Sequence, residues 1–191
     1  MVICHKDMMS EFMKEPRRTV AEIKARETGI RSSSTLRIGY FADASWGVNT
    51  FHQIQANPDL EIAFICLRHQ NPDPQLEKLA AEAGIECFTV HRVNEEEALE
   101  RFAKYRCDLH VSMSFDQIFK APLINLPPLK TINCHAGALP FYRGRSILNW
   151  VLINGETDYG ITVHFMDESI DTGDIVLQRR YAIAPQDDYR T

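Results

Sequence analysis

The feature that most constrains the fold is a regular alternation of short apolar runs and helix-like segments from Leu36 onwards. The apolar runs have the length of buried strands, and the segments between them carry the start and stop signals of helices. The predicted strands are 36–41, 60–67, 85–90, 107–113, 131–135, 160–166 and 175–183. The predicted helices are 46–56, 74–83, 95–105 and 146–154, with one or two helical turns over 117–125.

Strands that alternate with helices are typical of βαβ units, in which helices cover both faces of a parallel sheet. We therefore predict a Rossmann-like α/β fold with a mostly parallel sheet, whose ligands bind beyond the carboxyl ends of the strands. No G-x-G-x-x-G or Walker loop follows a strand, so the chain carries no dinucleotide fingerprint. Asn94 is predicted to cap the helix over 95–105.

Charge and length divide the 191 residues into two parts. Residues 1–35 carry seven Lys/Arg and five Asp/Glu, whereas residues 36–191 carry 14 and 21, a net charge of −7. We expect residues 1–35 to be a mobile N-terminal extension and residues 36–191 to be one folded domain. The acidic domain argues against a nucleic-acid partner. The chain has neither a membrane-length apolar run nor a signal-peptide core, which predicts a cytoplasmic protein without a membrane partner.

The stretch TINCHAGALPFYRG, residues 131–144, places Asn133, Cys134 and His135 at the end of a predicted strand. Side chains alternate along a strand, so Asn133 and His135 share a face while Cys134 points to the core. This geometry disfavours a metal site and a direct Cys–His pair. An amide beside an imidazole suits oxyanion stabilisation and proton transfer. On this stretch alone, a packed histidine bonded to the backbone, with Asn133 closing a turn, is the simpler interpretation.

A carboxylate that would orient such a histidine is available in the stretch HFMDESIDTGDI, residues 164–175. Asp171, Thr172 and Gly173 form a predicted tight loop between two strands, at an end of the sheet. The spacing does not fit a calcium loop. For Asp167, Glu168 and Asp174, a solvated acidic turn is the simpler interpretation.

Taken together, the Asn-x-His pair, the Leu-Pro-x-Tyr-Arg-Gly turn, the Gly-Ile-Thr-Val-His strand and the Asp-Thr-Gly loop resemble those of the 10-formyltetrahydrofolate-dependent formyltransferases. The resemblance runs from about residue 37 to residue 188 and is strongest over 107–178. The stretch HAGALPFYRGRSILNWVLINGE is most similar to the sugar-nucleotide N-formyltransferases, which formylate a 4-amino sugar on a dTDP or UDP carrier. Lipopolysaccharide or O-antigen biosynthesis is the setting that this similarity implies.

The resemblance implies Asn133, His135 and Asp171 as the catalytic residues, with direct attack of the amine on the formyl carbon and no metal. It implies that 10-formyltetrahydrofolate is the co-substrate and that its pterin binds the loops 114–119 and 167–171. The corresponding candidates are Phe115, Asp116, Gln117, Ile118, Asp167 and Glu168 for the folate, and Arg143, Asn149 and Trp150 for the substrate. His164 matches a histidine of related enzymes, although packing alone also explains it.

Several alternatives remain open at this level. For Phe115 and Ile118, packing of a turn is an equally good interpretation, and Trp150 fits a core position better than a sugar platform. Chains of this family continue past the position of Asp188, so a truncated, inactive folate- or nucleotide-binding remnant is the main alternative to an enzyme. A methionyl-tRNA formyltransferase-like enzyme is the other, although the −7 charge counts against an RNA substrate. A homodimer is compatible with the sequence.

Overall fold

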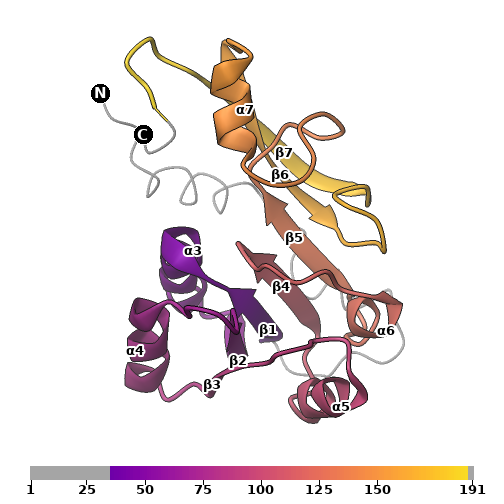
Figure 1. The fold of residues 1–191 in the computed structure, drawn as a ribbon. Coiled ribbons are helices and arrows are strands. Elements are labelled where there is room, and N and C mark those ends of the chain that lie inside the picture. Colours follow the sequence, from indigo (N-terminus) through magenta and orange to yellow (C-terminus); the bar gives the residue numbers. More distant parts are fainter. Residues whose placement is uncertain (1–34, 189–191) are drawn as a thin grey trace.

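The computed structural model describes residues 35–188, which form a seven-stranded sheet with helices on both faces (Figure 1). The strands are β1 (Leu36–Ala42), β2 (Leu60–Leu67), β3 (Cys87–Thr89), β4 (Leu109–Met113), β5 (Thr131–His135), β6 (Asp158–Phe165) and β7 (Ile175–Ala182). The helices are α3 (Ala44–Gln55), α4 (Pro74–Glu82), α5 (Glu96–Lys104), α6 (Ala121–Ile124) and α7 (Ile147–Ile153). Apart from Thr35, the predicted N-terminal extension lies outside the described residues.

The strand order in the sheet is β3-β2-β1-β4-β5-β6-β7. In this order, all neighbouring strands from β3 to β5 run parallel to each other. Strand β6 pairs antiparallel with β5, and β7 pairs antiparallel with β6. The predicted fold, an α/β layout with a mostly parallel sheet, is confirmed. Neighbouring parallel strands are joined by crossover connections, and the helices in these connections cover both faces of the sheet.

Two apolar clusters fill the space on the two sides of the parallel strands. On one side, alternate residues of β1 and β2 such as Tyr40 and Ile65 pack with α3 and α4. On the other side, their neighbours Phe41 and Phe64 pack with α5 and α6. All four side chains have no exposed surface. Burial on both faces explains why these strands read as unbroken apolar runs in the sequence.

The helix starts show which local signals worked. Asp43 accepts a hydrogen bond from the Ala44 N–H at the start of α3, and Asp73 accepts from the N–H groups of Gln75 and Leu76 at the start of α4. The predicted cap at Asn94 is wrong. Helix α5 begins one residue later than predicted, with Glu95 at its N-cap position.

The Asn94 side chain is instead committed to a distant loop. It donates to the carbonyl oxygen of Ile118 and accepts from the N–H of Lys120, both at 2.8 Å. These two bonds satisfy loop backbone groups that no strand or helix partner reaches. They also help to explain why the predicted helical turns over 117–125 shrink to the four residues of α6. Among residues 35–188, no helix is long and apolar enough to cross a membrane.

Candidate active site

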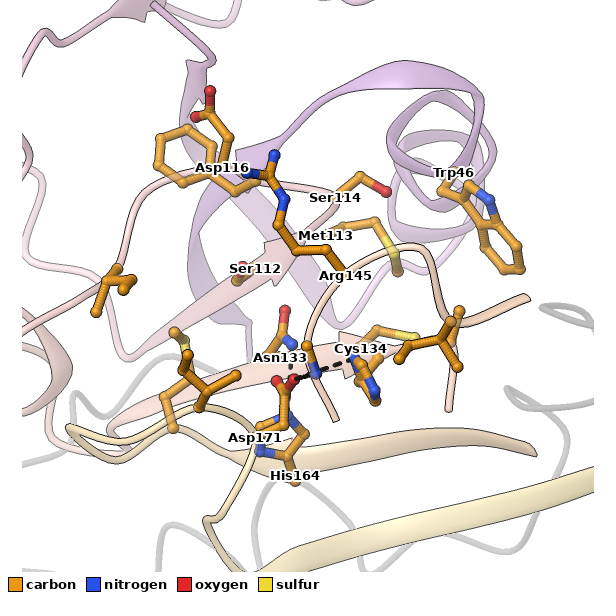
Figure 2. Close-up of a pocket in the computed structure, with 18 of the residues that line it drawn as sticks. Trp46, Ser112, Met113, Ser114, Asp116, Asn133, Cys134, Arg145, His164 and Asp171 are labelled. Atoms are coloured by element: carbon orange, nitrogen blue, oxygen red, sulfur yellow. Dashed lines mark hydrogen bonds and ion pairs between the residues drawn. The ribbon is translucent and has the colours of Figure 1, made fainter. Parts of the chain in front are cut away.

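A cleft of about 810 Å³ opens at the carboxyl ends of β4 and β5, next to the start of α7 and the loop between β6 and β7. The sheet edge, the turn after β5 and the 167–171 loop all contribute to its walls (Figure 2). This size is typical of pockets that bury a small molecule. Its position agrees with the rule that α/β sheets bind ligands beyond the carboxyl ends of their strands.

Asn133 and His135 lie one above the other on β5, on the face of the strand that meets Asp171 and His164. The Nδ2 atom of Asn133 is 3.4 Å from Nε2 of His164, which is its direct partner on β6. The Nδ1 atom of His135 is 3.5 Å from Oδ2 of Asp171. The structure thus brings together the three residues predicted as catalytic, and it adds His164 as a fourth member of the cluster.

Asp171 contacts both imidazoles, those of His135 and His164. Its Oδ1 atom is 3.4 Å from Nε2 of His164, and its Oδ2 atom also accepts the Gly144 N–H at 2.8 Å. Burial works to raise the pKa of Asp171, but the hydrogen bonds from His164 and Gly144 and the charges of both histidines outweigh it, so the pKa lies below its ordinary value. Asp171 is therefore a carboxylate at neutral pH.

Backbone carbonyl groups fix how each histidine presents its nitrogens. Nε2 of His135 is 2.7 Å from the carbonyl oxygen of Tyr142, and Nδ1 of His164 is 2.8 Å from that of Phe165. A carbonyl oxygen only accepts, so each of these nitrogens carries a hydrogen. The other nitrogen of each ring then faces Asp171, at 3.5 Å for His135 and 3.4 Å for His164.

Two glycines allow the chain to approach these groups closely. A Cβ atom on Gly137 would lie 2.4 Å from the Tyr142 carbonyl oxygen and 2.5 Å from His135 Nε2. A Cβ atom on Gly173 would lie 1.9 Å from the Phe165 carbonyl oxygen. Only glycine fits such approaches without moving the backbone. The first keeps His135 in place, and the second holds the loop that carries Asp171.

Of the competing interpretations of the 131–144 stretch, the packed histidine fits in part, because His135 is buried and bonded to the Tyr142 carbonyl oxygen, whereas a direct Cys–His pair does not fit. Cys134 packs against the apolar cluster of α3 and α4, and burial raises its pKa to about 12, so it is a protonated thiol at neutral pH. Within residues 35–188, no group of three or more His, Cys, Asp and Glu side chains is placed to hold a metal ion.

The predicted folate residues lie mostly around the cleft. Phe115, Asp116, Gln117, Ile118 and Asp167 line it, while Glu168 lies outside and accepts the Ala121 N–H at 3.3 Å. Phe115 packs edge-on against Phe41 and Phe119, and the Ile118 side chain is 63% exposed. The Gln117 side chain is bonded to Val93 and Val90, so it ties two loops together.

The predicted substrate residues divide in the same way. Asn149 lines the cleft, whereas Arg143 and Trp150 do not. Trp150 is also not a core residue, because its side chain is 55% exposed. The helix that follows the turn is short, so its outer face is left open beside β6.

Four residues that line the cleft were missed or left undecided by the sequence: Arg68, Ser112, Arg145 and His164. The guanidinium of Arg68 donates through Nε and Nη2 to the Ser114 carbonyl oxygen, which fixes the turn after β4. Arg145, rather than Arg143, reaches over the cleft from the turn after β5 (Figure 2). The sequence pattern that could have identified Arg68 is a charged residue directly after an apolar strand.

Comparison with known proteins places this site in context. A family model described as Formyl transferase matches residues 49–191. A methionyl-tRNA formyltransferase of Trichlorobacter lovleyi is 37% identical over 118 residues, which cover 62% of this chain and 37% of the relative. One of Geobacter sulfurreducens is 40% identical over 115 residues, covering 60% and 36%. The chain thus spans little more than a third of the length of these two relatives.

Solved structures share the fold at lower sequence identity. Glycinamide ribonucleotide transformylase 1 from Symbiobacterium toebii superposes with a TM-score of 0.68 at 22% identity, covering 80% of this chain and 76% of that one. Phosphoribosylglycinamide formyltransferase from Anaplasma phagocytophilum gives a TM-score of 0.70 at 20% identity, covering 81% and 76%. At this identity the likeness establishes the fold.

Proposed function

The chain belongs to the formyl transferase family, and we propose that it transfers a formyl group from 10-formyltetrahydrofolate to a primary amine. The observation that carries the proposal is the cluster of Asn133, His135, His164 and Asp171 on one wall of the cleft. It combines an amide donor for a developing oxyanion with a carboxylate–imidazole system that can accept a proton.

The residues divide the work of amine attack between them. Asn133 Nδ2 carries two hydrogens, of which one faces His164 and the second is free to donate to the formyl oxygen as negative charge develops there. As the new C–N bond forms, the amine nitrogen gives up a proton. Asp171, which faces both imidazoles and accepts the Gly144 N–H, is the charged group that can take up that proton.

The cleft fits the co-substrate in its chemistry. Its wall between β4 and α6 offers Phe115, Ile118 and Met113 as apolar surface for a flat ring system. The adjoining 167–171 loop is held in shape by Asp167, whose carboxylate accepts from the Ser169 N–H and the Thr172 hydroxyl. 10-Formyltetrahydrofolate would supply the formyl carbon, and backbone groups of the two loops would bind its pterin.

For the acceptor we propose a 4-amino sugar linked to dTDP or UDP. The turn His135-Ala136-Gly137-Ala138-Leu139-Pro140 and the acidic charge of residues 36–191 support this class over RNA. Arg145 and Asn149 are the polar side chains on the acceptor side of the cleft. A guanidinium there suits a phosphate or a sugar hydroxyl.

Initiator methionyl-tRNA is the second candidate acceptor. The observation that favours it is the 37–40% identity with two methionyl-tRNA formyltransferases. An RNA acceptor would need cationic surface to contact its phosphates, and such binding would weaken steeply as salt increases.

The test is an acceptor panel with the full chain. Purified protein and 10-formyltetrahydrofolate would be incubated with dTDP- and UDP-linked 4-amino sugars, with glycinamide ribonucleotide and with initiator methionyl-tRNA. Release of tetrahydrofolate would be followed together with the mass of each acceptor. We expect formylation of one amino-sugar nucleotide, with His135→Ala as the inactive control.

Each other outcome has a definite meaning. Formylation of methionyl-tRNA alone would replace the first acceptor with the second. Absence of any formylated product from folded protein that binds folate would contradict the proposed transfer and favour a folate-binding remnant.

A further inference from the structure

Ser112 is a buried polar residue that neither the fold nor the cluster around Asp171 accounts for. It lies on β4 and is only 4% exposed, yet its side chain lines the cleft. The Ser112 hydroxyl is not one of the described side-chain atoms that are both fully buried and without a partner, so it is open to the cleft. A hydroxyl that opens into a cleft can donate a hydrogen bond to a ligand there, which an alanine in the same place could not do.

The position of Ser112 relative to Asn133 follows from the sheet register. Ser112 pairs directly with Asn133 on β5, and Asn133 pairs directly with His164 on β6. Paired residues of neighbouring strands point to the same face of the sheet. The three side chains therefore form one polar row across three strands, with Asn133 in the middle (Figure 2).

The strand neighbours show that this polarity is specific to the row. On the other side of Ser112, its partner on β1 is Phe41, a fully buried member of the apolar cluster. Ser112 thus stands at the border between the apolar core and the polar row. A small hydroxyl at this border faces the cleft from the side of Asn133 that His164 does not occupy.

A second donor at this place meets a requirement of the chemistry. Both ring nitrogens of His135 are engaged, Nε2 with the Tyr142 carbonyl oxygen and Nδ1 with Asp171. His135 therefore has no N–H left to aim at a formyl oxygen. Oxyanion sites usually combine two donors that converge on the same atom, and Asn133 alone supplies one.

We propose that Ser112 is a further catalytic residue, whose hydroxyl donates to the formyl oxygen of the bound folate and forms a two-donor oxyanion site with Asn133. This inference rests on the proposed formyl transfer and names one more group in the same site. As the amine adds to the formyl carbon, the C=O bond becomes a C–O⁻ bond, and both donors strengthen their hydrogen bonds to it. When the bond between the formyl carbon and N10 of the folate breaks, the C=O bond returns and N10 takes up the proton that the amine released.

The test separates contact with the formyl oxygen from turnover. The affinities of 10-formylfolic acid and folic acid would be measured by fluorescence quenching for wild type, Ser112→Ala and Phe115→Ala. We expect wild type to prefer the formylated ligand and Ser112→Ala to lose about tenfold of that preference, the usual range of one hydrogen bond. Phe115→Ala removes apolar wall that both ligands share, so it should weaken both and leave their ratio unchanged.

Transfer kinetics and thermal melting complete the test. Ser112→Ala should melt as wild type does, because it removes a hydroxyl that opens into the cleft, and its kcat should fall about 10²-fold. An unchanged ligand ratio, or a wild type without any preference, would overturn the inference. Ser112→Ala could lose the preference for the formylated ligand while the wild type transfers no formyl group. This result would support the contact with the formyl oxygen and contradict the proposed function instead.

Discussion

The two ends of the sheet differ in what their side chains do. Around β1 to β4, alternate residues enter two apolar clusters, and most of β1 and β2 is fully buried. Beyond β5, the edge strand β7 has no fully buried residue, and the neighbouring loops carry the Asp171 cluster and the open cleft. The parallel strands form the buried scaffold, and the polar groups of the cleft lie near β5 and the antiparallel strands β6 and β7, whose arrangement is visible in Figure 1.

The difference shows how the fold separates stability from chemistry. Burial of apolar surface supplies most of the free energy of folding, and here it is concentrated in β1 and β2, away from the Asp171 cluster. The cluster of Asn133, His135, His164 and Asp171 is built from one strand, β5, that borders both regions, plus β6 and a loop. Substitutions in the scaffold should therefore change stability first, and substitutions in the site should change activity first.

The largest expected effect is on stability, in Phe64→Ala. Phe64 is fully buried and touches Phe41, Phe88 and Phe102 through its ring. Its removal should cost about 3–5 kcal/mol in the free energy of unfolding, measured by urea titration. The matched control is Ile153→Ala on α7, which is 71% exposed and should change stability by less than about 0.5 kcal/mol. Similar losses in both variants would refute the contrast.

Gly173→Ala should combine a moderate loss of stability with a loss of transfer. The new Cβ would overlap the Phe165 carbonyl oxygen, so the loop that holds Asp171 must move. We expect about 1–3 kcal/mol of destabilisation and a large fall in kcat. Gly84→Ala is the control in the scaffold: φ there is +67° and no atom lies near, so it should cost about 1 kcal/mol without changing transfer. Wild-type kcat in Gly173→Ala would count against this role for the loop.

The two regions should also respond to acid at different pH values. Burial among aromatic rings lowers the pKa of His110 to about 3. The unfolded chain then binds a proton below about pH 6.5 that the folded chain does not bind, so stability should fall as pH decreases from 6.5 towards 3, by up to about 1.4 kcal/mol per pH unit. Asp171 should respond at lower pH. Because its pKa lies below the ordinary value, the stability that its carboxylate contributes is lost only below about pH 4.

Urea titrations at several pH values check this expectation. His110→Leu should flatten the slope between pH 6.5 and 4.5, whereas Asp171→Asn should leave it in place. A wild-type stability that does not change over this range would show that His110 is not held neutral by burial.

The smallest expected effect concerns the acceptor side of the cleft. Arg145 lines the cleft and Arg143, two residues earlier, does not. Arg145→Ala should raise the acceptor KM about tenfold, the scale of one charge-assisted hydrogen bond, while Arg143→Ala should change it less than about twofold. Equal effects would place the acceptor elsewhere.

The sequence predicted the scaffold well because its signals are local. Apolar runs such as Leu60–Leu67 match the observed strand, and Thr131–His135 has the predicted bounds. Asn94 failed because a tertiary bond to the 118–120 loop took the side chain that could have capped a helix. Such competition between local and distant partners does not appear in a pattern of neighbouring residues.

The site was predicted in part. Strand alternation placed Asn133 and His135 on one face, and the resemblance supplied Asp171. Arg145 and Ser112 were not singled out, because their places at the cleft depend on which way a turn folds and on the register of β4 against β5. Trp150 was expected in the core and lies exposed, since α7 ends after seven residues and leaves its outer face open.

The measurement that tests the central claim most directly is the rate of formyl transfer by Asn133→Ala, with the acceptor found in the panel, beside its unfolding free energy. Asn133 is the one group of the cluster with an N–H free to meet a formyl oxygen. The account predicts a fall in kcat of about 10²–10³-fold, with stability close to that of wild type. Full transfer by a folded Asn133→Ala protein would contradict it.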